Sequence, residues 1–120
     1  MRNILIVEDE SSMRKKYREV LRPEGFKVFQ ARDAVEVANM LMRESSTLDL
    51  IILDINIKEL DGRDIFDIID QYNPSLPILV SSVHPLQDQR LKIPRATDWH
   101  NKSDGDTIFL KKVKKILGLN

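Results

Sequence analysis

The fold can be predicted from one stretch of the chain, Leu48-Asp49-Leu50-Ile51-Ile52-Leu53-Asp54-Ile55-Asn56. Residues 50–53 form an unbroken apolar run, which is typical of a strand in a parallel sheet with helices on both faces. The run ends at Asp54, and in open α/β sheets ligands bind at the carboxyl ends of the strands. Asp54 is therefore a candidate active group, although a carboxylate that only opens a loop or caps a turn would fit the same pattern.

Four further strands are predicted on either side of this stretch. The first, Asn3–Val7, also stops at carboxylates, Glu8 and Asp9. The others are Phe26–Gln30, which alternates like an edge strand, Pro77–Ser82, which ends in hydroxyls, and the weak strand Ala96–Asn101, which is followed by Lys102.

Helices are predicted between these strands because apolar residues recur at helical spacing. The expected buried positions are Met13, Tyr17, Val20 and Leu21 in the first helix, Val35, Ala38, Leu41 and Met42 in the second, Ile65, Ile68, Ile69 and Tyr72 in the third, and Phe109, Val113, Ile116 and Leu117 in the last. Asp33 and Glu36 have the spacing of a capping box. A short helix is expected from Leu86 to Lys92.

Five strands alternating with helices predict an α/β fold of the (βα)₅ type, a three-layer sandwich because crossovers are right-handed. The flavodoxin-like strand order 2-1-3-4-5 is the common solution. This order brings Glu8, Asp9 and Asp54 together, with Ser82 and Lys102 beside them.

Composition is consistent with one domain over residues 1–120. The formal net charge is zero, so bulk charge indicates neither a nucleic acid nor a membrane partner, and the clusters Arg14–Arg18 and Lys111–Lys115 are interpreted as solvated helix faces. The chain has no cysteine, and Met1 leads almost directly into a strand without room for a signal peptide. We expect a cytoplasmic protein.

The predicted cluster indicates phosphoryl chemistry. Carboxylates about 5 Å apart repel by about 3 kcal/mol per pair at an effective dielectric near 20, so a compensating cation is needed. Mg²⁺ suits a site with oxygen ligands, whereas zinc prefers histidine or cysteine. Lys102 and Ser82 would then bind phosphoryl oxygens, and the central Asp54 is the candidate nucleophile. A surface ion pair for Lys102 and a strand-end hydrogen bond for Ser82 are the alternatives for each residue alone.

With these residues in place, the chain resembles the receiver domain of two-component response regulators over essentially its whole length. The matching segments are Ile6–Glu10, Leu53-Asp54 through Asp61-Gly62, Pro77–Ser82, and Lys102 before the final helix. The resemblance implies that Asp54 accepts a phosphoryl group from a histidine kinase or phosphotransfer protein.

The resemblance also implies further roles. Asp9 and Asp54 would bind Mg²⁺ directly, Glu8 through water, and Asn56 through its backbone carbonyl. Ser82 would be the switch hydroxyl and Trp99 the switch aromatic, although Trp99 could be a plain core residue. Asn56 and His84 lie where the family tunes dephosphorylation, and the output face would comprise the fourth helix, fifth strand and fifth helix.

Four departures from the family pattern affect these expectations. Ser103 replaces the usual proline after Lys102, which leaves the direction of the lysine open, and Lys58 replaces another proline. Val83 stands where a smaller residue is common and could restrict access to the phosphoryl group. The segment between Ser82 and Trp99 is short, so a stunted fourth helix is expected.

Three alternatives remain. A phosphatase with an aspartyl-phosphate intermediate would need a second aspartate where Asn56 stands, and in a flavodoxin the acidic segment Glu8–Glu10 would repel the phosphate of the flavin. The more serious rival is a receiver-like interaction module that is never phosphorylated. We expect no enzyme activity beyond the domain's own phosphorylation and dephosphorylation. Its output would go to a partner protein or to an output domain of a longer regulator or hybrid kinase, with no direct contact to nucleic acid or membrane.

Overall fold

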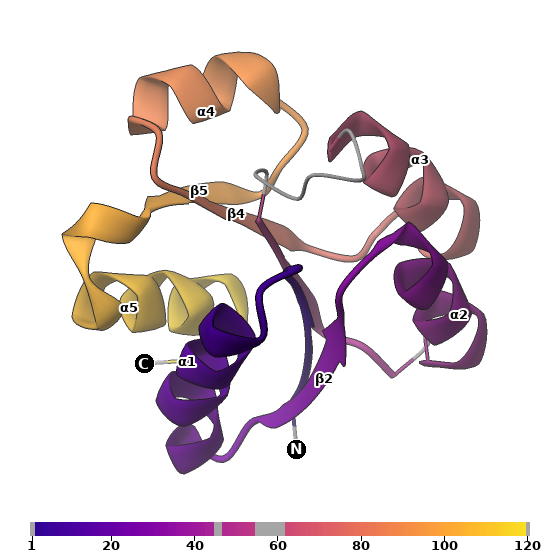
Figure 1. Ribbon diagram of the computed structural model, residues 1–120, viewed down its shortest axis with the longest axis horizontal. Coiled ribbons are helices and arrows are strands. Elements are labelled where there is room, and N and C mark those ends of the chain that lie inside the picture. The colour runs from indigo at the N-terminus through magenta and orange to yellow at the C-terminus, as the bar shows by residue number, and fades with distance from the viewer. Residues whose placement is uncertain (1, 45–46, 55–61, 120) are drawn as a thin grey trace.

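The computed structural model describes residues 2–44, 47–54 and 62–119, with side chains from residue 64 onward in the last range. Its five strands form one parallel sheet, in the order β2-β1-β3-β4-β5 (Figure 1). They are β1 Asn3–Val7, β2 Lys27–Ala31, β3 Leu50–Asp54, β4 Ile78–Ser82 and β5 Asp98–Asn101. The predicted fold and strand order are confirmed, and β2 lies at the sheet edge as its alternating sequence indicated.

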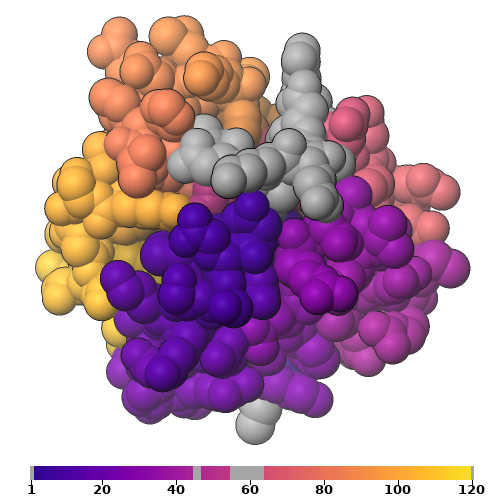
Figure 2. Space-filling model, in the orientation of Figure 1, coloured from indigo at the N-terminus to yellow at the C-terminus, as the bar shows by residue number. Residues whose placement is uncertain are grey.

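Helices cover both faces of this sheet. They are α1 Ser11–Leu21, α2 Ala34–Glu44, α3 Gly62–Tyr72, α4 Leu86–Lys92 and α5 Asp106–Ile116. One face is covered by α1 and α5, which meet along one side of the molecule, and the other by α2, α3 and the segment after α4 (Figures 1 and 2). In the described part of the chain, none of these helices has the length and apolar character needed to cross a membrane.

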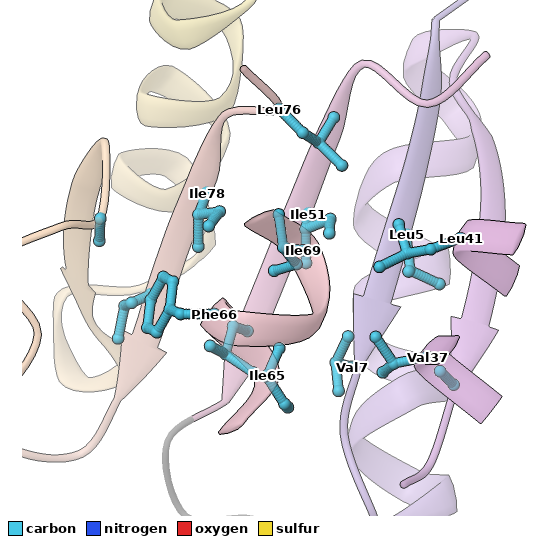
Figure 3. Packing of buried hydrophobic residues seen from close by; sticks show 14 of the residues in the cluster. Leu5, Val7, Val37, Leu41, Ile51, Ile65, Phe66, Ile69, Leu76 and Ile78 are labelled. Atoms are coloured by element: carbon cyan, nitrogen blue, oxygen red, sulfur yellow. The ribbon is translucent and has the colours of Figure 1, made fainter. Parts of the chain in front are cut away.

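The strands divide their side chains between two apolar clusters. Leu5 and Val7 of β1 pack with α2 and α3, whereas Ile4 and Ile6 pack with α1 and α5. Figure 3 shows the first cluster, in which Ile51 of β3 lies between the residues of α3 and those of β1. Successive residues of a strand point to opposite faces, so an unbroken apolar run is what a strand buried on both sides requires.

The predicted buried face of α2 is partly wrong. Leu41 is buried as expected, but Val35 and Met42 have exposed fractions of 68% and 65%, and Val37 is buried in their place. Apolar residues occupy most positions of this helix, so periodicity alone does not identify one face. Packing against the sheet and α3 selects the face that contains Val37 and Leu41.

The predicted capping box of Asp33 and Glu36 is present at the start of α2, but Glu36 accepts its hydrogen bond from a different residue than expected. Asp33 Oδ1 accepts a hydrogen bond from the N–H of Glu36 at 2.9 Å. Glu36 Oε1 accepts one from the N–H of Arg32 at 2.8 Å, rather than from the capping residue itself. The pair still satisfies two backbone donors at the helix start.

The other helices follow the predicted pattern with one exception. The residues predicted for α1 and α5 contribute to one apolar cluster, and Ile65, Ile68 and Ile69 of α3 to the other, whereas Tyr72 has an exposed fraction of 37%. The basic residues of α5 are less solvated than predicted: Lys112 donates a hydrogen bond to the backbone carbonyl of Trp99, and Lys114 pairs with Glu24 at 2.6 Å.

Candidate functional site

The sheet register brings the acidic residues to one edge. Val7 of β1 pairs with Leu53 of β3, so Glu8 and Asp54 follow at the same level of adjacent strands. Asp54 itself pairs with Ser81 of β4. Because parallel strands end on the same side of the sheet, carboxylates that lie some 46 positions apart in the sequence become neighbours.

These residues line a pocket of about 290 Å³ at the carboxyl edge of the sheet. Its lining comprises Glu8, Asp9, Glu10, Met13, Asp54, Val83 and Lys102. Glu8 and Asp54 are both buried, each with an exposed fraction of 3%, while Asp9 is half-buried. Four of the predicted site residues, Glu8, Asp9, Asp54 and Lys102, are therefore in one place.

Lys102 supplies the positive charge of this pocket. Its Nζ forms an ion pair with Asp54 Oδ2 and lies 3.8 Å from Glu8 Oε2. Lys102 follows β5 and begins a short 3₁₀ helix, Lys102–Asp104, which is capped where Asn101 Oδ1 accepts a hydrogen bond from the N–H of Ser103 at 3.0 Å. The Lys102–Ser103 peptide is trans, and the ammonium nevertheless reaches Asp54.

Glu8 carries the main electrostatic perturbation of the site. Burial, followed by the hydrogen bonds and charge of the neighbouring Asp54 and Asp9 carboxyls, raises the pKa of its carboxyl to about 9, although the N–H of Glu10 acts in the opposite direction. That N–H donates to Glu8 Oε1 at 3.2 Å. Glu8 therefore holds a proton at neutral pH as long as no additional cation is near.

The donor set fits Mg²⁺. Glu8 Oε2 is buried and has no hydrogen-bond partner, as expected of an oxygen that is available to a cation or to water bound to it. Among the described residues no three carboxylate or imidazole side chains form a ready-made metal cage, but Mg²⁺ requires only one or two carboxylates and keeps several waters. Asn56, another predicted ligand, lies outside the described residues, as does Lys58.

Arg14 was missed as a site residue by the sequence analysis, which assigned it to a solvated helix face. Its Nη1 donates hydrogen bonds to the backbone carbonyls of Glu8 at 2.8 Å and Asp9 at 3.1 Å. The guanidinium thereby ties the acidic loop to the first turns of α1. The only sequence signal is an arginine five residues after Asp9, which does not by itself distinguish a clamp from a surface charge.

Ser82 and His84 lie on the β4 side of the pocket. Ser82 is fully buried, and its Oγ accepts a hydrogen bond from the N–H of His84 at 3.1 Å. Ser82 does not line the acidic pocket, whereas the next residue, Val83, does so with an exposed fraction of 64%. The structure thus places the predicted hydroxyl next to the site but turned toward its own loop.

Trp99 lies away from the carboxylates. Its ring packs against the cluster of α2 and α3, its Nε1 donates to the carbonyl of Ile93 at 2.9 Å, and the Arg90 guanidinium carbon is 5.5 Å from the ring centroid. Trp99 therefore joins β5 to both the middle and the end of α4, which spans the predicted residues Leu86–Lys92 and is only seven residues long.

The buried hydrogen bond between Tyr17 and Ser81 was also missed by the sequence analysis. The hydroxyl of Tyr17 donates to Ser81 Oγ at 2.9 Å, and burial raises the pKa of this tyrosine. His100 packs its ring 5.3 Å from that of Phe109, and burial lowers the pKa of the imidazole. The sequence analysis placed Tyr17 in the apolar core because its spacing matches the helix period. Helical periodicity cannot reveal a hydrogen-bond partner that lies 64 residues away in the sequence.

Comparison with known proteins identifies the family. Residues 4–99 match the sequence model of the response regulator receiver domain. Two curated relatives are a protein-glutamate methylesterase/protein-glutamine glutaminase of Rhodospirillum rubrum, 38% identical over 84 residues, and the KDP operon transcriptional regulatory protein KdpE of Escherichia coli, 32% identical over 93 residues.

The match covers most of this chain but less than half of the length of each of these relatives. It covers 69% and 76% of this chain but only 22% and 39% of theirs.

A solved structure, the response regulator protein TrrA of Thermotoga maritima in complex with Mg²⁺ and BeF, is 27% identical, with a TM-score of 0.84 over 98% of this chain and 100% of that one. From the match over residues 4–99 and this agreement in fold, the chain belongs to the response regulator receiver domain family.

Proposed function

We propose that this domain accepts a phosphoryl group on Asp54 in a Mg²⁺-dependent reaction and thereby switches a protein-interaction face. The observation that carries the proposal is the buried Asp54 carboxylate, paired with Lys102 and adjacent to Glu8 and Asp9 in one pocket. The phosphoryl donor is a histidine kinase or phosphotransfer protein, in accord with the family.

In the transfer step, an Oδ atom of Asp54 forms a bond to phosphorus while the phosphorus–nitrogen bond of a phosphohistidine breaks. The imidazole of the donor takes up a proton and leaves in its neutral form. The carboxylate is a weak nucleophile, so catalysis consists mainly of positioning and of neutralising charge on the transferred oxygens.

Two side chains of this domain are suited to that neutralisation. The Lys102 ammonium exchanges its ion pair with Asp54 for contact with a phosphoryl oxygen. The Ser82 hydroxyl turns from the N–H of His84 toward a second oxygen. Both are charge-assisted hydrogen bonds, which are about twice as strong as neutral ones.

Glu8, Asp9, Asp54 and the carbonyl of Asn56 would hold Mg²⁺, Glu8 through water. The ion supplies positive charge that lets an anionic group approach the acidic pocket. Arg14 supports this set because it holds the backbone of Glu8 and Asp9.

The output in this proposal is a shift between two conformations of α4, β5 and α5. Trp99 is the switch aromatic, since it links β5 to α4, and Asn56 and His84 tune the rate of dephosphorylation. The downstream partner is a protein or an output domain. Because KdpE is a transcriptional regulatory protein, a DNA-binding output segment is compatible with this proposal. The receiver domain itself would contact protein. A reducing cytoplasm is the proposed location, in accord with the absence of cysteine.

The test is intact mass after incubation with acetyl phosphate and Mg²⁺. We expect wild type to gain one phosphoryl group and Asp54→Asn to gain none. Asp88→Asn, the same change at an exposed position of α4, serves as the matched control and should behave as wild type. Excess EDTA should prevent the gain.

Absence of the modification in wild type, under conditions where another receiver domain is modified, would refute the proposal and favour an interaction module that is never phosphorylated. Modification of Asp54→Asn to the same extent as wild type would instead refute the assignment of the acceptor residue.

A further inference from the structure

Gln89 is a fully buried polar residue on the short surface helix α4, with an exposed fraction of 0%. An amide removed from water destabilises the fold unless it is hydrogen-bonded, so such a residue needs partners. Its neighbours on the helix, Gln87, Asp88 and Arg90, are exposed. The helix therefore directs one amide into the molecule.

This amide joins two segments that are not otherwise close in sequence. Nε2 of Gln89 donates one hydrogen bond to the carbonyl of His84 at 2.7 Å and another to the carbonyl of His100 at 2.9 Å. The first carbonyl belongs to the loop between β4 and α4, and the second to β5. Figure 1 shows α4 beside β5, with the chain entering the helix from the end of β4. Both donors of the NH₂ group are thus used.

The two segments carry the residues proposed to bind phosphoryl oxygens. Ser82 lies two residues before His84, and its Oγ accepts the N–H of that same residue at 3.1 Å. Lys102 lies two residues after His100 and reaches Asp54. Ser82 is already paired with Asn101 in the sheet, and the two hydrogen bonds of Gln89 add a link between His84, just beyond that pair, and His100, just before it.

The oxygen of the same amide argues against fold stability as the reason for a glutamine at position 89. Oε1 of Gln89 is buried and has no hydrogen-bond partner. An unsatisfied buried acceptor destabilises the folded state. Core stability alone is therefore a poor explanation of a glutamine at this position. The link that its two donated hydrogen bonds make between the His84 and His100 segments is a better explanation.

We propose that Gln89 is a positioning residue that, together with the pairing of β4 and β5, fixes the separation between the Ser82 hydroxyl and the Lys102 ammonium, and so the affinity of the pocket for a tetrahedral phosphoryl group. This inference rests on the proposed function. Among the proposed Mg²⁺ ligands, Glu8 and Asp9 follow β1 and Asp54 ends β3, and the two hydrogen bonds that Gln89 donates go to other segments, so Mg²⁺ affinity should be independent of it. A displacement of about 1 Å in a catalytic group can reduce a rate by about a hundredfold, so the loss of this link has a measurable effect.

The test compares Gln89→Met with the matched control Gln87→Met. Methionine keeps the length and flexibility of glutamine but lacks the two donors. The probe is beryllofluoride, an analogue of the phosphoryl group, titrated in excess Mg²⁺ and followed by ¹⁹F NMR, while calorimetry gives the Mg²⁺ affinity alone. We expect Gln89→Met to lower beryllofluoride affinity by about tenfold or more, with Mg²⁺ affinity within about twofold of wild type. Gln87→Met should match wild type in both.

Wild-type beryllofluoride affinity in Gln89→Met would overturn the inference, as would a parallel loss of Mg²⁺ affinity, which would indicate general damage to the site. If methionine prevents folding, Gln89→Leu replaces it, since leucine is apolar and also lacks the donors, and the same loss is expected. If wild type itself does not bind beryllofluoride, the proposed function fails and this inference with it. Binding by wild type with no effect of Gln89 rejects the inference alone.

Discussion

Substitution of Glu8 by glutamine tests the electrostatics of the acidic pocket directly. Glu8 has an ordinary pKa of 4.5 in the unfolded chain and a raised pKa, about 9, in the folded protein. Between these values the folded state binds a proton that the unfolded state has released. Stability therefore falls as pH rises through this window, by up to 1.36 kcal/mol per pH unit.

The magnitude follows from the pH interval. Between pH 5 and pH 7.5 without divalent cations, the linkage predicts that Glu8 lowers the free energy of unfolding by roughly 3 kcal/mol. Any folded-state pKa well above 7.5 gives nearly the same value, so the prediction does not depend on its exact position. Glu8→Gln has nearly the same shape and no titration, so it should lack this loss and be the more stable protein at pH 7.5.

The assay is urea unfolding of both proteins in EDTA at several pH values. Glu10→Gln is the control, because Glu10 is exposed in the same loop and its substitution should leave the slope with pH as in wild type. Parallel stability curves for wild type and Glu8→Gln from pH 5 to 7.5 would show that Glu8 is ionised in the folded protein, and the reasoning on burial would be refuted.

Three further predictions concern contacts around the site. Tyr17→Phe should lower the free energy of unfolding by about 1–2 kcal/mol in urea titrations, since the Ser81 hydroxyl loses its donor. Adding Ser81→Ala to that variant should cost little more, and additive effects in the double-mutant cycle would contradict the contact. Lys102→Met should destabilise the Mg²⁺-free protein by about 3 kcal/mol, because it removes the ammonium between buried carboxylates, and Mg²⁺ should restore part of the loss in thermal unfolding. Arg14→Gln should weaken Mg²⁺ binding by about tenfold in calorimetry, and an unchanged affinity would show that the clamp on the acidic loop is dispensable.

The main features of the fold could be predicted from local sequence. Apolar runs that end in polar residues identify the strands, and right-handed crossovers leave few topologies for a (βα)₅ chain. The same reasoning predicted that Glu8, Asp9, Asp54 and Lys102 meet, because strand ends are defined along the chain and parallel strands share one edge. These inferences depend on short-range patterns and on a general rule of chirality.

The features that could not be predicted depend on which face of a helix packs and on where long side chains reach. Val37 rather than Val35 is buried because the neighbouring α3 and the sheet select one face of a helix that is apolar at most positions. Arg14 and Gln89 have no sequence pattern that separates a buried contact from a solvated one.

The sequence by itself thus determined the strands, their order and the acidic residues at their ends, since these follow from patterns of neighbouring residues. Only the tertiary structure decided that Glu8 is buried enough to keep a proton, that Ser82 faces its own loop, and that one amide of α4 joins the segments that carry Ser82 and Lys102. Burial, hydrogen-bond partners and pKa depend on atoms that are distant in sequence, and they are defined only when the chain has folded.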